Sequence, residues 1–245
     1  MSSKTPTPKT PTPGINTLLT RCGYDPRDYF GFVNPPVVHA STVLFPDAAT
    51  MASRNQKYTY ATRGTPTSDA LAEAVDALEG SAGTIVVPSG LAAVTVPLLA
   101  FLSAGDHVLI VDSVYHPTRN FADTMLTRLG VEVQYYAPEI GAGIASLMKS
   151  NTRVVFTEAP GSNTFEMQDI PAIAKAAKQW GAVVMMDNTW ATPVYFRPLE
   201  HGVDISIHAA TKYPAGHSDL LLGTVSANEE HWPRLLATHH TLGAC

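Results

Sequence analysis

The sequence contains only two cysteines, Cys22 and Cys245, among its 245 residues. They lie far apart and form no CxxC pair, which excludes a disulfide framework and a thiolate metal site. Charged residues are also scarce, at 15 %, and the net charge of −5 offers no basic surface for nucleic acid or anionic lipid. No hydrophobic run is long enough to span a bilayer. These scarcities favour a globular protein of the reducing cytoplasm that binds neither nucleic acid nor membrane.

The two ends of the sequence have little hydrophobic content. Residues 1–14 lack the apolar core of a signal peptide, and their Thr, Pro and Lys content predicts a disordered tail. Residues 15–59 are expected to form an extended arm, because Asn34-Pro35-Pro36 excludes a helix there. Residues 60–245 are predicted to be one α/β domain. Residues 239–245 favour a loop inside a longer protein, so we expect a C-terminal small domain to be missing.

From Thr65 onward, hydrophobic runs typical of strands alternate with helical patterns. This alternation predicts an α/β fold, a mostly parallel sheet with helices on both faces. The expected strands are 84–88, 107–111, 131–136, 153–157, 182–187, 203–208 and 221–227. The expected helices are 68–79, 90–103 with an interruption at Pro97, 117–129, 144–148 and 170–180.

An aspartate and a lysine follow two of the expected strands. Asp187 ends the strand in MMDNTW, and Lys212 lies in HAATKYPAGHSD after the next strand. Ligands of parallel sheets bind beyond the carboxyl ends of the strands. A pyridoxal-phosphate (PLP) enzyme needs such a pair, because a lysine forms the Schiff base and a carboxylate keeps the pyridine nitrogen protonated. Taken singly, the two residues also fit a surface lysine and a turn aspartate.

The chemistry of these two groups agrees with that role. A free lysine amine, with a pKa of about 10.4, is almost fully protonated at neutral pH and is a poor nucleophile. Desolvation in a cofactor pocket lowers that pKa and frees the amine of Lys212. The carboxylate of Asp187 keeps the ring nitrogen charged, so that the ring can stabilise a carbanion.

The segment Ser89-Gly90-Leu91 follows a strand and opens a helix. Free N–H groups at a helix N-terminus favour phosphate, and glycine allows close approach of the backbone. The hydroxyls of Ser89 and Thr211 are further candidate donors to the phosphate. Ordinary helix capping by Ser89 is the alternative.

Three further side chains are candidates for the cofactor site. Tyr115, after the strand at 107–111, could stack on the pyridine ring. Tyr60 and Arg63, in YATRGTPT, supply a phenol and a guanidinium suited to phosphate. A buried core tyrosine and a solvated loop are the alternatives.

Other motifs do not support a different chemistry. Residues 141–143 (GAG) lack the third glycine of a dinucleotide-binding loop, which disfavours a nucleotide-dependent oxidoreductase. The nine histidines form no HExxH, so no metal site is expected. No GxSxG elbow surrounds Ser89.

With these residues in place, the sequence resembles the Cys/Met-metabolism PLP-dependent enzymes, and within them the bacterial cystathionine β-lyase branch. The resemblance runs from Thr17 to the last residue. Its densest segments are YATRGTPT, EGSAGTIVVPSGLAAV, LSAGDHVLIVDSVYHPTRNF, NTRVVFTEAPGS, MMDNTWATP and DISIHAATKYPAGHSD.

The resemblance implies the fold of a type I aminotransferase, with an N-terminal arm, a large PLP-binding domain and a small C-terminal domain. It also implies a homo-oligomer, usually a tetramer built from catalytic dimers. By resemblance, Lys212 carries the cofactor, Asp187 pairs with the pyridine nitrogen, Tyr115 stacks, and Gly90, Leu91 and Thr211 bind the phosphate. Tyr60 matches a tyrosine that reaches the phosphate in the neighbouring subunit.

Several positions depart from the usual family pattern. Thr62 replaces the phosphate-binding arginine of a Y-x-R motif, and Arg63 is our hypothesis for its substitute. Ala209 replaces a common serine, and Ser162 replaces an asparagine near the pyridoxal 3′-oxygen. The β-lyase branch shares Ser162 and Trp190.

The resemblance therefore predicts a carbon–sulfur lyase of methionine biosynthesis that acts on L-cystathionine or related cysteine S-conjugates, which are small amino-acid thioethers. Two alternatives remain open. One is another trans-sulfuration reaction, by a γ-synthase, γ-lyase or sulfhydrylase. The other is an inactive PLP-binding fragment, because the family's arginine for the substrate carboxylate lies in the C-terminal domain.

Overall fold

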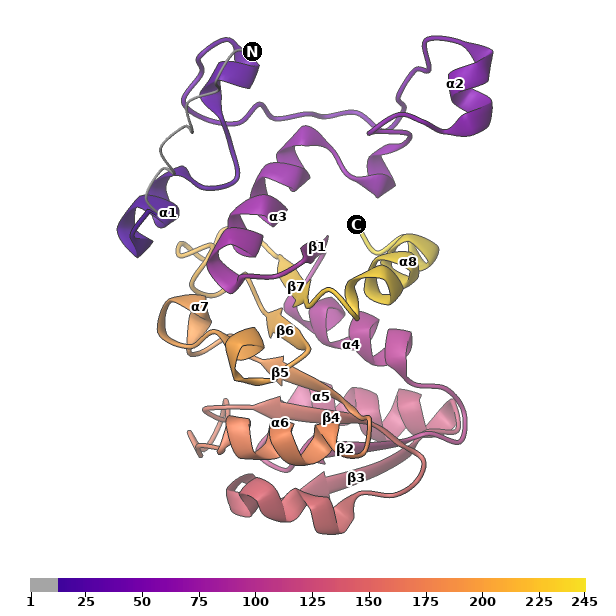
Figure 1. The fold of residues 1–245 in the computed structure, drawn as a ribbon, viewed down its shortest axis with the longest axis vertical. Helices are drawn as coiled ribbons and strands as arrows, with labels where there is room; N and C mark the ends of the chain where they lie inside the picture. The colour runs from indigo at the N-terminus through magenta and orange to yellow at the C-terminus, as the bar shows by residue number, and fades with distance from the viewer. Residues whose placement is uncertain (1–12) are drawn as a thin grey trace, which may run out of the picture.

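A seven-stranded sheet forms the centre of the fold (Figure 1). The computed structural model describes residues 13–245, so most of the predicted tail at 1–14 lies outside the described residues. In chain order the strands are β1 (Gly83–Val87), β2 (His107–Val111), β3 (Glu132–Tyr136), β4 (Thr152–Glu158), β5 (Val183–Asp187), β6 (Ile205–His208) and β7 (Gly223–Ala227). Their order across the sheet is β1-β7-β6-β5-β4-β2-β3.

The sheet is mostly parallel, as predicted. The strands from β6 through β5, β4 and β2 to β3 are parallel, and β7 is antiparallel to both β6 and β1. All seven predicted strands are present, with small shifts at their ends. Strands β2 and β6 are buried along their whole length, which explains why they are continuous hydrophobic runs.

Helices cover both faces of the sheet, as predicted. The helices are α1 (Ile15–Arg21), α2 (Ala48–Ser53), α3 (Pro66–Glu79), α4 (Gly90–Phe101), α5 (His116–Phe121), α6 (Ile170–Lys178), α7 (Thr192–Tyr195) and α8 (Trp232–Leu242). Helices α4, α5 and α8 pack on one face, and α3 and α6 lie on the other. The 3₁₀ segments are η1 (Pro26–Tyr29), η2 (Ala61–Arg63), η4 (Pro138–Leu147) and η5 (Pro198–His201), and η3 (Ala122–Leu126) is a π-helical turn.

Two expectations about helices were wrong. Helix α4 continues through Pro97, where an interruption was predicted, because most of this hydrophobic helix is buried and its packing outweighs one missing backbone hydrogen bond. Residues 239–242, predicted as a loop, belong to α8. That helix buries Leu235 and ends at Gly243, which has a left-handed conformation.

Two other helices differ in detail from their prediction. The helix expected at 117–129 begins as α5 and continues as the π-helical turn η3. The short helix expected at 144–148 is the end of a longer 3₁₀ segment, η4, that bends at Gly141 with a φ of +49°.

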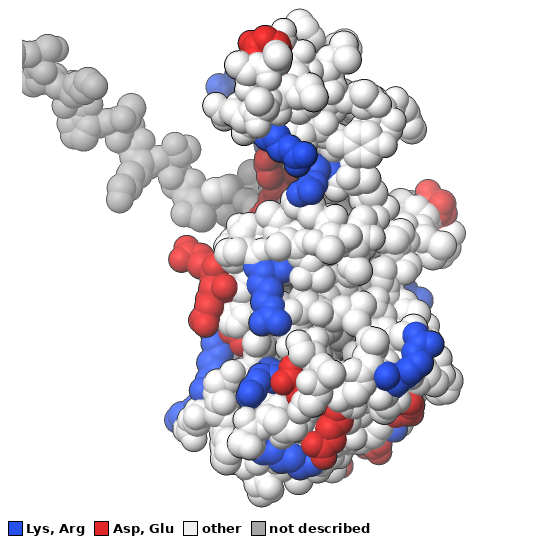
Figure 2. All heavy atoms as spheres, turned by 90° about the vertical axis from the view of Figure 1, so that its right-hand side faces the viewer, with Lys and Arg blue, Asp and Glu red and all other residues white. Residues whose placement is uncertain are grey.

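The predicted arm, residues 15–59, contains the short helices α1 and α2 (Figure 1) and, between them, the 3₁₀ segment η1. Residues 34–36 are not helical, as their prolines predicted. Within residues 13–245, no helix combines the length and hydrophobicity needed to span a membrane, and no cluster of His, Cys, Asp or Glu is arranged to hold a metal ion. Figure 2 shows charged side chains of both signs separated by wide uncharged areas on the face drawn.

Candidate cofactor-binding site

The carboxyl ends of six strands meet at one edge of the sheet. Strands β2 to β6 are parallel, and β1 points the same way because both β1 and β6 are antiparallel to β7. Ligands of such sheets bind at this edge. The segments that follow the strands there are 88–91, 112–115, 159–162, 188–190 and 209–212.

Asp187 is the last residue of β5 and is partly buried. Its Oδ1 accepts a hydrogen bond from the N–H of Thr189 at 3.0 Å. Within the described residues, no lysine or arginine forms an ion pair with it. Burial raises the pKa of Asp187, although the hydrogen bonds from Thr189 and the charge of nearby His208 oppose that rise. A cation placed at this carboxylate would compensate the cost of burying it.

The segment that carries Lys212 is bonded directly to the segment that follows Asp187. The N–H of Ala209 donates to Oγ1 of Thr189 at 2.8 Å, and the N–H of Lys212 donates to the carbonyl of Ala209 at 2.9 Å. The Lys212 side chain is exposed. The desolvation of its amine that we expected in a cofactor pocket is therefore not provided by this chain alone. Thr189, which links the two segments, was not identified from the sequence.

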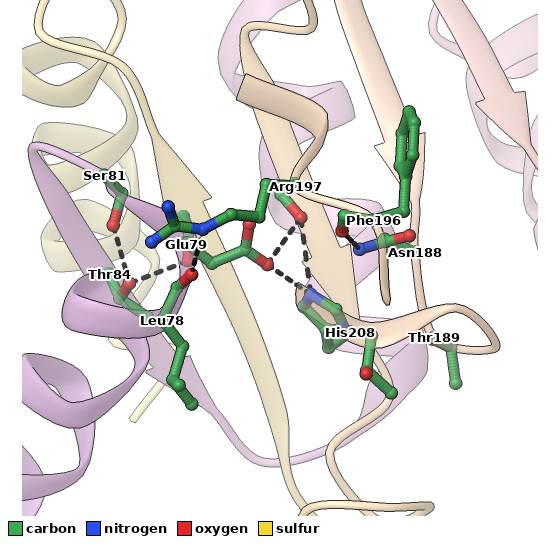
Figure 3. Close-up of polar contacts among 12 residues, drawn as sticks. Leu78, Glu79, Ser81, Thr84, Asn188, Thr189, Phe196, Arg197 and His208 are labelled. Atoms are coloured by element: carbon green, nitrogen blue, oxygen red, sulfur yellow. Dashed lines mark hydrogen bonds and ion pairs between the residues drawn. The ribbon is translucent and has the colours of Figure 1, made fainter. Parts of the chain in front are cut away.

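A buried polar cluster joins the end of α3 to β6, the strand that precedes the Lys212 segment (Figure 3). Oε1 of Glu79 contacts His208 Nε2 at 2.5 Å and accepts a hydrogen bond from Ser206 Oγ at 2.8 Å. The Arg197 Nε–H donates to the Leu78 carbonyl at 2.7 Å. These contacts fix the end of β6 immediately before the segment that leads to the lysine.

The N-terminus of α4 packs against the same segment. Ser89 Oγ accepts from the N–H of Ala92 at 3.1 Å, so Ser89 caps α4, and its O–H remains available as a donor. The N–H groups of Gly90 and Leu91 have no acceptor among the described residues. A Cβ atom on Gly90 would lie 2.5 Å from the Cβ of Ala209, so only glycine allows this approach. The free donors therefore lie close to the Lys212 segment, where a phosphate would be needed.

Two of the predicted residues share a support that sequence reasoning missed. Glu158, the last residue of β4, accepts from the N–H of Tyr115 at 2.9 Å and from the N–H of Ser162 at 2.7 Å. The Tyr115 side chain is 46 % exposed, which leaves its ring available for stacking. A carboxylate at the end of a predicted strand was the available signal, as it was for Asp187.

The predicted phosphate ligand Thr211 lies next to the lysine. It is partly buried, and its N–H donates to the carbonyl of Leu222 at 3.1 Å. Leu222 directly precedes β7, so this bond ties the lysine segment to the start of that strand.

Tyr60 and Arg63 lie elsewhere. They line a cavity of about 700 Å³ together with residues of α3, β1 and α8, including Trp232 and His240. Arg63 Nη1 lies 2.9 Å from His240 Nδ1. The structure therefore does not bring these two residues together with Lys212 in one chain.

The remaining residues fit PLP. Asp187 is a partly buried carboxylate without a lysine or arginine partner among the described residues, and Lys212 is an amine without a hydrogen bond or ion pair among them. Gly90 and Leu91 supply free N–H donors. Tyr115 adds an accessible ring. The donors and charges match the amine-reactive aldehyde, the ring nitrogen and the phosphate of this cofactor.

Comparison with known proteins supports the same chemistry. A family model described as Cys/Met metabolism PLP-dependent enzyme matches residues 16–245. A relative from Rhizobium johnstonii, provisionally named a cystathionine β-lyase, is 75 % identical over 232 residues, 95 % of this chain and 59 % of the relative. Cystathionine β-lyase MetC of Escherichia coli is 40 % identical over 236 residues, 94 % of this chain and 60 % of the relative.

A solved structure agrees with the fold. The crystal structure of metB from Corynebacterium glutamicum matches with a TM-score of 0.90 and 31 % identity, over 95 % of this chain and 60 % of that one. The chain thus spans about 60 % of the length of the relatives it matches.

Proposed function

The chain belongs to the Cys/Met metabolism PLP-dependent enzymes, and from this membership we propose that the protein is a carbon–sulfur β-lyase acting on L-cystathionine or related cysteine S-conjugates. The hydrogen bond from Ala209 to Thr189, which joins the segments of Asp187 and Lys212, is the observation that carries the proposal. The β-lyase names of two relatives favour this reaction within the family.

The proposed mechanism assigns a task to each group. When bound, PLP supplies an electron-withdrawing ring that stabilises negative charge on the substrate Cα. Lys212 Nζ would hold the cofactor and then, once displaced by the substrate amine, take the Cα proton, a general-base step typically worth ~10²–10⁴-fold. The electron pair left on Cα would expel the sulfur from Cβ as a thiolate, which would take up the proton held by Lys212 Nζ. Homocysteine leaves, and addition of water yields pyruvate and ammonia.

The other residues bind and orient the cofactor. Asp187 would keep the ring nitrogen protonated, and Tyr115 would stack on the ring. The N–H groups of Gly90 and Leu91 would bind the phosphate, as would the hydroxyls of Ser89 and Thr211. Ser162 would lie near the 3′-oxygen of the ring.

We further propose that the protein works as a homo-oligomer, a dimer or tetramer, in which Tyr60 and Arg63 reach the phosphate site of a neighbouring copy. Their position in a cavity away from Lys212 supports this arrangement. If Arg63 replaces the family arginine absent at Thr62, Arg63→Ala should weaken PLP binding. Unchanged PLP affinity in that variant would remove Arg63 from the site.

Borohydride reduction tests the assignment of the lysine. Reduction of the PLP-loaded protein, followed by peptide mapping, should place the label on Lys212. Lys212→Ala should lose the visible absorbance and the label, whereas Lys175→Ala, which removes an exposed lysine of α6, should keep both. Normal turnover by Lys212→Ala would contradict the mechanism.

The products from L-cystathionine distinguish the reactions of the family. A β-lyase releases pyruvate, whereas γ-cleavage releases 2-oxobutyrate. Formation of 2-oxobutyrate would replace the proposal with a γ-reaction. PLP binding without turnover would support the alternative of a non-catalytic fragment.

A further inference from the structure

Glu158 joins two segments that start from different strands. Its carboxylate is almost fully buried, with 4 % of the residue exposed. One oxygen accepts from the N–H of Tyr115, at the start of α5, and the other from the N–H of Ser162, beyond β4. Each oxygen therefore holds the backbone of one residue that the proposed function places around PLP.

Glu158 is itself held in place. Its strand lies between β2 and β5 in the sheet. Its carbonyl accepts from Gln168 Nε2 at 2.6 Å, and Gln168 Oε1 accepts from the Tyr136 hydroxyl at 3.0 Å. Gln168 and Tyr136 are both buried. Because Glu158 is anchored in this way, its hydrogen bonds can hold the two segments that contain Tyr115 and Ser162 in fixed positions.

The location of this carboxylate is costly for the fold. Glu158 and Asp187 are directly paired across the parallel strands β4 and β5. Burial, followed by the charge of Asp187, raises the pKa of Glu158 to about 7. Two neighbouring acidic groups at the end of buried strands lower the free energy of unfolding, because burial and mutual repulsion both disfavour their charges. A hydrophobic residue at position 158 would avoid this cost. This cost indicates a role beyond stability.

We propose that Glu158 is a positioning residue of the cofactor site, which acts by fixing the backbones of Tyr115 and Ser162 around PLP. The inference rests on the proposed PLP site. It assigns to Glu158 no contact with the cofactor. The effect of Glu158 must therefore pass through the two residues it bonds, and this separates a positioning role from direct binding.

The test measures the PLP dissociation constant by visible absorbance in the wild type and in Glu158→Gln. The amide of glutamine can accept only one of the two N–H groups and places its own NH2 donor against the other, so one hydrogen bond is lost and one donor is left opposed. We expect PLP affinity to fall about 10- to 100-fold. Glu139→Gln, which removes an exposed carboxylate at the start of η4, is the matched control and should bind as the wild type does. Wild-type affinity in Glu158→Gln would overturn the inference.

A double variant tests whether the effect passes through the stacking residue. Tyr115→Ala removes the ring, so adding Glu158→Gln should then weaken binding by a smaller factor than it does alone. Two effects that multiply in full would show that Glu158 does not act through Tyr115, and would overturn the inference.

A second substitution keeps the test decisive if Glu158→Gln does not fold. Glu158→Asp retains the charge but is one methylene shorter, so it cannot bond both N–H groups at once. It should also bind PLP more weakly, and wild-type affinity would count against the inference. Failure of the wild type to label at Lys212 with borohydride would instead refute the proposed function itself.

Discussion

Glu158 and Asp187 end neighbouring strands, and burial raises the pKa of both carboxyls. The hydrogen bonds from Tyr115 and Ser162 oppose this rise in Glu158, and those from Thr189 oppose it in Asp187. Each carboxylate is thus held by N–H donors in a place where its charge is unfavourable for the fold. At the scale of single residues, these two carboxylates contribute less to the stability of the fold than hydrophobic residues would, and their negative charge suits a cationic ligand.

The raised pKa of Glu158 predicts a pH-dependent stability of the PLP-free protein. The pKa is about 7 when folded and 4.5 ordinarily, so the folded state binds a proton more tightly than the unfolded state. The contribution of protonated Glu158 to the free energy of unfolding is fully present below pH 4.5 and is lost as the pH rises to about 7. The loss is up to roughly 3 kcal/mol. Urea unfolding at pH 5 and pH 8 should show this loss in the wild type relative to Glu158→Gln, and parallel profiles would contradict it.

Thr189 predicts a loss of PLP affinity without a large loss of structure. Thr189→Val keeps the shape but leaves the N–H of Ala209 without its acceptor, so the segment of Lys212 is less well fixed. PLP affinity should fall about 10-fold, as expected for one hydrogen bond. Thr189→Ser keeps the hydroxyl and should bind like the wild type in the same absorbance titration. Equal affinity of the valine and serine variants would contradict this role.

At the scale of secondary structure, strand ends were the most informative feature of the sequence. Buried hydrophobic runs predicted all seven strands, and Asp187 and Lys212 followed from their ends. Glu158 carried the same signal, a carboxylate at the end of a predicted strand, but its hydrogen bonds to the N–H groups of Tyr115 and Ser162 leave no pattern in the sequence. Thr189 carried no such signal. Helix α8 was missed because its proline and adjacent histidines obscure a helical pattern that packing against β1 and α4 stabilises.

The start of α4 predicts a specific steric effect. In Gly90→Ala, the new Cβ would lie 2.5 Å from the Cβ and 2.9 Å from the Cα of Ala209, so helix and Lys212 segment must separate. The free energy of unfolding should fall by about 1–3 kcal/mol, with weaker PLP binding. Ala209→Gly should restore part of the loss. Gly14→Ala, with nothing within 4 Å, is the control in the same denaturation series.

At the scale of the whole molecule, the N-terminal arm exposes large hydrophobic side chains. Phe30 is 97 % exposed, Leu44 86 % and Val33 83 %. Such exposure is typical of surfaces that contact another protein. The arm also leads to Tyr60 and Arg63, which line a cavity away from the segment of Lys212. Residue patterns alone could not place these two residues, because their proposed role depends on a second copy of the chain, and only the family resemblance indicated that role for Tyr60.

The proposed oligomer predicts complementation between two defective variants. Lys212→Ala lacks the catalytic amine, and Arg63→Ala lacks the proposed phosphate ligand donated to a neighbour. In a mixed dimer, one site combines an intact Lys212 from one copy with an intact Arg63 from the other. After subunit exchange at equal concentrations, lyase activity should rise to about a quarter of the wild-type value, because half of the dimers are mixed and each has one intact site. No gain over the separate variants, with exchange verified by mass spectrometry, would show that Arg63 acts within its own chain or not at all.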